Sequence, residues 1–176
     1  TGVTTVDSLV PIGLGQRQLV VGDAHSGIDN FLVNVMVNQS TQKTDLICIY
    51  AAIGKPLSQI NSLINTLSIN KALAQTIVVA TSSADGSPLI YLTPQTALTI
   101  AEYFKNQGKN VLVILDDMGV HAKAYREISL LSGRTPGRES YPGDIFYSQA
   151  RILERAGKFK TGGSITALPV IKLNLN

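Results

Sequence analysis

The chain alternates short, fully apolar runs with longer segments in which apolar residues recur at helical spacing. The apolar runs, rich in β-branched residues, occupy residues 19–21, 46–50, 76–80 and 111–115. Because they are apolar on both faces, they predict strands buried within a parallel sheet. Residues 164–175 form one more apolar stretch and predict a further strand near the end of the chain.

The segments between these runs predict helices. After Pro56, the apolar residues of 57–67 fall on one face of a helix. Thr93 followed by Pro94 predicts the start of a second helix, since threonine caps helices and proline is tolerated at the first helical position. Gly108 predicts its end. Alternating strands and helices predict an α/β fold in which a mostly parallel sheet carries helices on both faces.

Composition narrows the class of protein. The 176 residues fit one domain, and 44% hydrophobic with 15% charged residues excludes a disordered chain. A single cysteine, Cys48, cannot form a disulfide framework, and no apolar run reaches the roughly 20 residues of a membrane-spanning helix. The low charged fraction indicates a surface partly covered by neighbouring subunits.

Charge is unevenly distributed along the chain. The first 100 residues carry four basic and five acidic residues, and the remainder carries eleven basic and seven acidic ones. The basic residues are dispersed among acidic ones, with few aromatic residues between them. This pattern does not predict a nucleic-acid partner.

The first chemical motif, GDAHSGID at residues 22–29, directly follows the first predicted strand. Gly22 and Gly27 have the spacing of a P-loop, the strand-to-helix loop that holds phosphate groups. Ile28 and Asp29 stand where such a loop has lysine and a metal-ligating Ser or Thr. Isoleucine cannot neutralise a phosphate and a carboxylate repels it, so the motif is either a degenerate phosphate loop or a turn without a ligand. The candidate nucleotide-binding residues are Gly22, Asp23, Ala24, His25, Ser26, Gly27, Ile28 and Asp29.

A second motif, VLVILDD at residues 111–117, is an apolar strand that ends in acidic residues. In P-loop NTPases the corresponding Walker B carboxylate holds the metal ion or its water, and Asp116 is the candidate for that position. Together the two motifs favour the P-loop class.

Longer segments identify a family. Residues 1–23 and 134–159 closely resemble the nucleotide-binding domain of the alpha subunit of F-type ATP synthases. The resemblance continues through IYAAIGK (49–55), SPLIYLTP (87–94) and GGSITALPVI (162–171), so it covers essentially the whole chain. The run containing PGRE, YPGD and ARILER favours ring subunits over the flagellar ATPases and Rho helicases that share the fold.

The resemblance implies a RecA-like P-loop domain from a ring in which alpha and beta subunits alternate. Beta sites turn over ATP, whereas alpha sites bind Mg-nucleotide without turnover. The position after IYAAIG is a catalytic Glu in beta and Gln in alpha, and here it is Lys55. Lysine cannot act as the base that orients water, so the domain is expected to be non-catalytic by itself.

Three further positions match interface or active-site periphery residues of the family. They are Arg138 and Glu139 of PGRE and Asp144 of YPGD. The proline–glycine pairs beside them also predict turns, whatever the function.

The resemblance also implies partners and a location. The expected partners are beta-type catalytic subunits in a hexameric ring and a central rotor, with membrane contact only through the complex, on the bacterial cytoplasmic or mitochondrial matrix side of an energy-transducing membrane. Residues 1–176 are expected to be one RecA-like domain of a longer alpha-type subunit. The family's N-terminal β-barrel, C-terminal helical domain and arginine finger would lie outside them.

The loop departs from the family pattern, which has Arg and Gln where Ala24 and His25 stand. His25 could donate to phosphate or be an exposed loop imidazole. With the loop lysine and Thr also absent, binding of Mg-ATP or Mg-ADP is expected to be weak or lost. We instead expect Lys55 to pair with Asp29 or Asp116, in place of the missing metal and lysine.

Three functions remain open at the level of sequence. The first is a non-catalytic alpha-like subunit that supports a rotary ATPase or ATP synthase ring. The second is a weakly active NTPase with an unusual loop. The third is a repurposed P-loop domain with a structural or assembly role.

Overall fold

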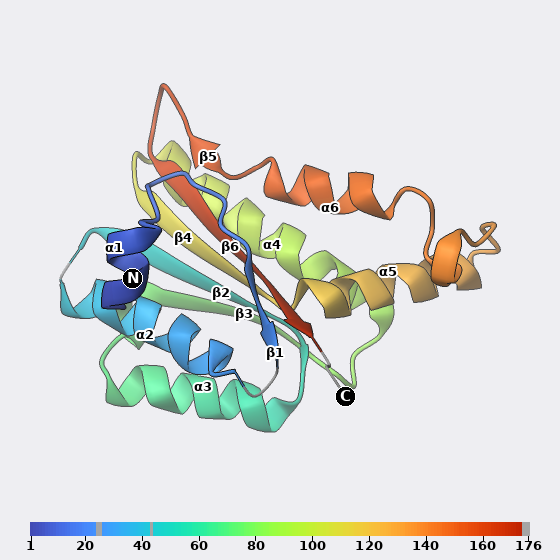
Figure 1. Ribbon diagram of the computed structural model, residues 1–176, viewed down its shortest axis with the longest axis horizontal. Coiled ribbons are helices and arrows are strands. Elements are labelled where there is room, and N and C mark those ends of the chain that lie inside the picture. Colours follow the sequence, from blue (N-terminus) through green and yellow to red (C-terminus); the bar gives the residue numbers. More distant parts are fainter. Residues whose placement is uncertain (24–25, 43, 174–176) are drawn as a thin grey trace.

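A parallel sheet forms the centre of the molecule (Figure 1). The computed structural model describes residues 1–23, 26–42 and 44–173, and the statements below concern these residues. The strand order is β1-β6-β4-β2-β3, with all neighbours parallel, and β5 adds an antiparallel pairing to β6. The strands are β1 (Val20–Asp23), β2 (Leu46–Lys55), β3 (Thr76–Ser82), β4 (Asn110–Asp116), β5 (Gly157–Lys158) and β6 (Ser164–Leu173).

Helices cover both faces of this sheet, as Figure 1 shows. The helices α2 and α3 pack on one face, and α4, α5 and α6 on the other. The predicted α/β architecture is therefore confirmed. The helices are α1 (Thr4–Leu9), α2 (Ile28–Thr41), α3 (Leu57–Ile69), α4 (Ser87–Asn106), α5 (Met118–Leu131) and α6 (Ile145–Leu153), with short 3₁₀ turns at Leu73–Gln75 and Arg138–Ser140.

The core has two layers because successive strand residues point to opposite faces. In β2, Ile49 and Ile53 pack beneath α4 and α5, whereas Cys48 and Tyr50 pack beneath α2 and α3. All four side chains are buried. This double burial is the physical reason why the strands read as continuous apolar runs.

The predicted start of α4 at Thr93 and Pro94 is wrong. The helix begins earlier, with Pro88 in its first turn, and Pro94 lies inside it. Proline in a helix removes one backbone hydrogen bond and costs about 3 kcal/mol. Residues before and after it, including Ile90 and Ala97, are buried on the same helix face. The free energy gained by burying these residues outweighs the preference of Thr93 and Pro94 for a helix start.

The other predicted strands and helices are present, although β1 and β2 extend beyond the apolar runs at residues 19–21 and 46–50, to Asp23 and Lys55. The helix α4 ends at Asn106, and Gly108 follows with a φ of +81°. The strand predicted at residues 164–175 is β6, and its last two predicted residues lie outside the described range. Within the described ranges, no helix combines the length and the apolar character needed to cross a bilayer.

Candidate functional site

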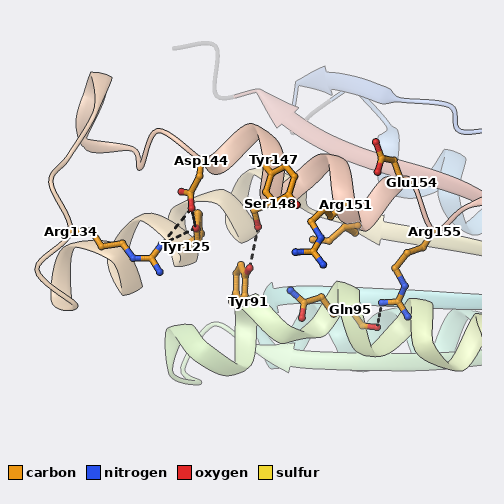
Figure 2. Close-up of a pocket in the computed structure, with 11 residues that line it drawn as sticks. Tyr91, Gln95, Tyr125, Arg134, Asp144, Tyr147, Ser148, Arg151, Glu154 and Arg155 are labelled. Carbon is orange, nitrogen blue, oxygen red and sulfur yellow. Dashed lines mark hydrogen bonds and ion pairs between the residues drawn. The ribbon is translucent and has the colours of Figure 1, made fainter.

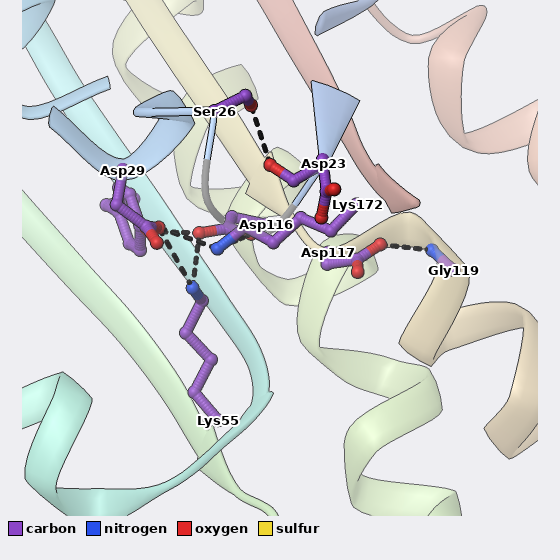
Figure 3. Close-up of polar contacts among 9 residues, drawn as sticks. Asp23, Ser26, Asp29, Lys55, Asp116, Asp117, Gly119 and Lys172 are labelled. Atoms are coloured by element: carbon purple, nitrogen blue, oxygen red, sulfur yellow. Dashed lines mark hydrogen bonds and ion pairs between the residues drawn. The ribbon is translucent and has the colours of Figure 1, made fainter. Parts of the chain in front are cut away.

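Three adjacent strands and the start of α2 bring polar side chains to one edge of the sheet (Figure 3). Lys172 lies near the carboxyl end of β6, Asp116 ends β4 and Lys55 ends β2. Asp29 lies in the first turn of α2, beyond the carboxyl end of β1. The carboxyl ends of parallel strands meet at one edge of a sheet, and this edge is where α/β proteins place their ligands. We call these four residues the ion-pair cluster.

Asp116 is the buried centre of the ion-pair cluster. Its side chain is fully buried, and the Nζ of Lys55 lies 2.6 Å from Oδ2. The Tyr50 hydroxyl donates a hydrogen bond to the same oxygen, while the Nζ of Lys172 lies 3.6 Å from Oδ1. Burial, and then the charge of Asp116, raise the pKa of Tyr50 well above its usual range, which keeps the hydroxyl a donor. Asp116 is thus compensated by protein groups alone.

Asp29 links the two lysines at the surface of the cluster. Its Oδ1 lies 2.6 Å from the Nζ of Lys172 and 3.5 Å from that of Lys55. Partial burial acts to raise the pKa of Asp29, but the hydrogen bond from Lys172 and the charges of both lysines outweigh it and lower the pKa below 3.8. The Asp29 side chain is 57% exposed, whereas those of Lys55 and Lys172 are only 11% and 16% exposed. Two ammonium groups therefore balance two carboxylates.

The described residues on either side of Ala24 and His25 contact each other across the predicted phosphate loop. The Ser26 hydroxyl donates to the Asp23 carbonyl at 2.6 Å, and Gly27 has a φ of +83°, a conformation that favours glycine. A Cβ on Gly22 would lie 2.7 Å from the Ser26 hydroxyl and 3.0 Å from the Cδ1 of Ile28. A side chain at position 22 would therefore clash with Ser26 and Ile28.

Ile28 belongs to the hydrophobic core. It is 6% exposed and lies in the same buried cluster as Leu32 and Val170. The position that carries lysine in a P-loop thus supplies an apolar contact between α2 and the sheet. Ala24 and His25, also named as candidate loop residues, lie outside the described residues.

The side chains at this site do not fit a magnesium-bound phosphate group. Asp116, at the Walker B position, already contacts an ammonium group, and Ile28 offers no charge to a phosphate. Asp29 adds a negative charge beside the loop. Among the described residues, no group of three or more His, Cys, Asp or Glu side chains could hold a metal ion.

The candidate interface residues lie apart from the ion-pair cluster. Arg138 and Glu139, with side chains 95% and 75% exposed, lie in the 3₁₀ turn between α5 and α6 and pair loosely at 4.0 Å. Asp144 directly precedes α6, where it accepts a hydrogen bond of 2.9 Å from the Tyr125 hydroxyl and lies 3.5 Å from Arg134. None of their ion pairs includes a member of the cluster.

Asp144 lines a cavity of about 750 Å³ bounded by α4, α5 and α6 (Figure 2). Arg155 closes one side of it through a pair of hydrogen bonds to Glu102 of α4, at 2.7 and 2.8 Å. Arg155 also donates to the Gln95 carbonyl at 3.2 Å. These contacts tie the segment after α6 to α4, so Arg155 has a structural role in this face of the molecule.

Sequence reasoning missed two members of the site, Lys172 and Tyr50. Lys172 ends an apolar run near the C-terminus, just as Lys55 ends another, and this shared position was a usable signal. Tyr50 reads only as one more apolar strand residue. Its contact with Asp116 depends on strand pairing between β2 and β4, which the sequence does not display.

Comparisons with known proteins identify the family of the chain. The model of the ATP synthase alpha/beta family, nucleotide-binding domain, matches residues 2–176. The chain is 47% identical over 175 residues to the ATP synthase subunit alpha of Clostridium botulinum (strain Eklund 17B / Type B), which covers 98% of this chain and 34% of that protein. It is 48% identical over 173 residues to the sodium ion specific ATP synthase subunit alpha of Acetobacterium woodii, again covering 98% of this chain and 34% of the relative.

The chain thus spans about a third of the length of the curated relatives that it matches. The matched range, residues 2–176, includes the strands, the GDAHSGID motif and the ion-pair cluster, and the match confirms the resemblance to alpha subunits drawn from the sequence. The chain belongs to the ATP synthase alpha/beta family and corresponds to its nucleotide-binding domain.

Proposed function

We propose that the chain is a non-catalytic, alpha-type domain of an F-type rotary ATPase ring in which internal ion pairs take the place of bound Mg-nucleotide. The observation that carries this proposal is the 2.6 Å contact between Lys55 and the fully buried Asp116. A carboxylate that holds a metal ion in active relatives of the fold would here have to release an ammonium group first.

Lys55 also supports the absence of catalysis. A residue that orients the attacking water must accept a hydrogen bond or a proton, and a protonated lysine has donors only. The Nζ of Lys55 is directed at Asp116 and Asp29 and is 11% exposed as a side chain. The domain would therefore support a catalytic neighbour and would not hydrolyse ATP itself.

The proposed partners are beta-type subunits of the ring and its central rotor, with the described domain as one part of a longer alpha-type subunit. Large apolar side chains on the surface favour such neighbours: Leu131 and Phe146 are each 82% exposed, and Ile69 is 80% exposed. One relative is a sodium ion specific ATP synthase subunit alpha, which supports a role of the proposed ring in ion transport. The ring would lie at the periphery of an energy-transducing membrane.

Nucleotide binding provides the direct test. We expect the protein to bind a fluorescent ATP analogue in excess Mg²⁺ at least a hundredfold more weakly than the triple variant Ile28→Lys/Asp29→Thr/Lys55→Gln, because two phosphate or metal contacts are regained, one repulsion is removed and Asp116 loses the ammonium group at 2.6 Å. Asp45→Thr changes the same charge at an exposed position near the opposite end of β2 and should bind as the parent does. Tight binding of Mg-ATP by the unmodified protein would refute the proposal.

A second measurement separates an alpha-type subunit from a repurposed structural domain. Co-expression of the longer alpha-type subunit that contains residues 1–176 with beta-type subunits and a rotor subunit should yield a ring in which it alternates with beta. If the protein remains a stable monomer in their presence, the structural alternative is correct. ATP hydrolysis by the purified protein without beta subunits would instead identify an unusual NTPase.

A further inference from the structure

Asp29 differs from the other members of the ion-pair cluster. It is 57% exposed, whereas the other three side chains are 16% exposed or less. Without Asp29 the cluster itself would hold two ammonium groups and one carboxylate, and outside it Asp117 adds negative charge near Lys172. An uncompensated charge that is largely removed from water is strongly unfavourable unless a counter-ion reaches it.

We propose that Asp29 acts as an internal ligand that fills an oxyanion site formed by Lys172 and Lys55. The site is latent in this chain, and removal of the Asp29 carboxylate opens it to a phosphate group that carries no metal ion. This inference rests on the proposed replacement of Mg-nucleotide by internal ion pairs and names the ligand class of the same site.

The contacts of Asp29 indicate where the external anion would sit. A single carboxylate oxygen, Oδ1, receives the hydrogen bond from Lys172 at 2.6 Å and approaches Lys55 at 3.5 Å. A phosphate oxygen accepts hydrogen bonds from ammonium groups in the same way. The net effect of the surrounding groups raises the pKa of Lys172: burial acts to lower it, but the charge of Asp116 and the hydrogen bond to Asp29 outweigh that effect. Lys172 therefore remains a cation at neutral pH.

The same arrangement disfavours the metal-bound form of a phosphate. Magnesium needs oxygen ligands, and the buried carboxylate of Asp116 is already in contact with Lys55 and Tyr50. Two ammonium groups within 3.6 Å of Asp116 would also repel a divalent cation. The preference for metal-free phosphate is the reverse of that expected at an intact P-loop site.

Solvent reaches the site through a groove between α2 and α3. The groove has a volume of about 530 Å³, and Asp29, Tyr50 and Lys55 form part of its lining. Asn30 and Asn34 of α2 also line it, which provides an uncharged polar wall. A phosphate group can thus approach Lys55 and the position of the Asp29 carboxylate, which contacts Lys172, without opening the sheet.

The test measures anion binding by Asp29→Asn with isothermal titration calorimetry. The probes are inorganic phosphate, pyrophosphate and ATP, each in EDTA and in excess Mg²⁺, so that the arms separate free phosphate from a nucleotide. We expect the variant to bind at least one of them in EDTA about tenfold or more tightly than the parent protein, and more weakly when Mg²⁺ is present. In Asp29→Glu a carboxylate should still fill the site, so this variant should bind the anions no more tightly than the parent does. Asp45→Asn is the matched control for loss of one negative charge.

The double variant Asp29→Asn/Lys172→Met isolates the role of Lys172. It restores charge balance, so it should fold without binding phosphate. A folded Asp29→Asn protein that binds none of the three anions overturns the inference, and so does tighter binding with Mg²⁺ than without it. If Asp29→Asn is unfolded in plain buffer, refolding by phosphate supports the inference and failure to refold overturns it.

The two proposals are refuted by measurements on different proteins, the unmodified chain and the variant Asp29→Asn. Tight Mg-ATP binding by the unmodified chain refutes the proposed function, whatever the Asp29 variants do. Absence of metal-free anion binding by Asp29→Asn refutes the latent site and leaves the proposed function standing.

Discussion

Replacement of Lys55 by methionine tests whether the ion-pair cluster holds the sheet edge together. Methionine keeps most of the apolar stem and removes only the ammonium group, which lies 2.6 Å from Asp116. The carboxylate then stays fully buried with the Tyr50 hydroxyl as its hydrogen-bond donor and Lys172 at 3.6 Å. Removal of one partner from a buried ion pair costs about 3–5 kcal/mol. Since Lys172 remains nearby, we expect a loss near the lower end, about 3 kcal/mol.

The assay is urea unfolding of the full chain at pH 7, followed by far-UV circular dichroism, with thermal unfolding as a second measurement. A loss of about 3 kcal/mol corresponds to a decrease in Tm of roughly 6–12 °C for a domain of this size. Lys172→Met is the comparison, because its closest partner, Asp29, is 57% exposed. That variant should lose only about 1 kcal/mol.

The double variant Lys55→Met/Asp116→Asn supplies the control for buried charge. Asparagine keeps an acceptor for Tyr50 and carries no charge, so the double variant should be more stable than Lys55→Met alone. The reasoning is refuted if Lys55→Met unfolds within about 0.5 kcal/mol of the parent. Equal losses for Lys55→Met and Lys172→Met would also refute it, because they would show that burial of Asp116 does not set the cost.

Three further predictions concern other parts of the molecule. Burial lowers the pKa of His121 from 6.5 to about 4, so the unfolded chain binds a proton at higher pH than the folded chain does. The free energy of unfolding should therefore fall by about 3 kcal/mol as the pH decreases from above 6.5 to 4. His121→Gln should remove this dependence in urea titrations across that range. Arg155→Met should cost about 1–2 kcal/mol in the same unfolding assay, because it breaks the paired hydrogen bonds to Glu102, whereas Arg138→Met at a 95% exposed side chain should cost nothing measurable. Burial raises the pKa of Cys48 to about 12, so its thiol should react with Ellman's reagent only at the rate of unfolding, and rapid labelling of the native protein would contradict its 1% exposure.

The elements that the sequence predicts correctly are those in which one local pattern dominates. The apolar runs at residues 46–50 and 111–115 mark β2 and β4, because a strand covered on both faces has no polar side to reveal. The predicted start of α4 is wrong because Thr93 and Pro94 form a strong local signal for a helix start. Burial of residues on both sides of Pro94 stabilises one continuous helix instead.

The site was accessible from sequence only where a family position drew attention to a residue. Lys55 stands where beta subunits of the family carry a catalytic Glu, and the structure brings it within 3.5 Å of both Asp29 and Asp116. Lys172 was overlooked because β6 lies between β1 and β4, and that strand order joins segments far apart in the chain. Ile28 reads as a lost phosphate ligand in the sequence, whereas the structure shows a core residue.

The charges of the ion-pair cluster balance one another within β2, β4, β6 and α2. This balance affects how the stability of the domain depends on ligand concentration. A protein stabilised by a dissociable ligand gains free energy that grows with ligand concentration by mass action. Lys55 and Lys172 are covalently part of the chain, so their contacts with Asp116 and Asp29 stay at one fixed effective concentration. Under the proposed function, the stability of this sheet edge would not change with the concentration of ATP.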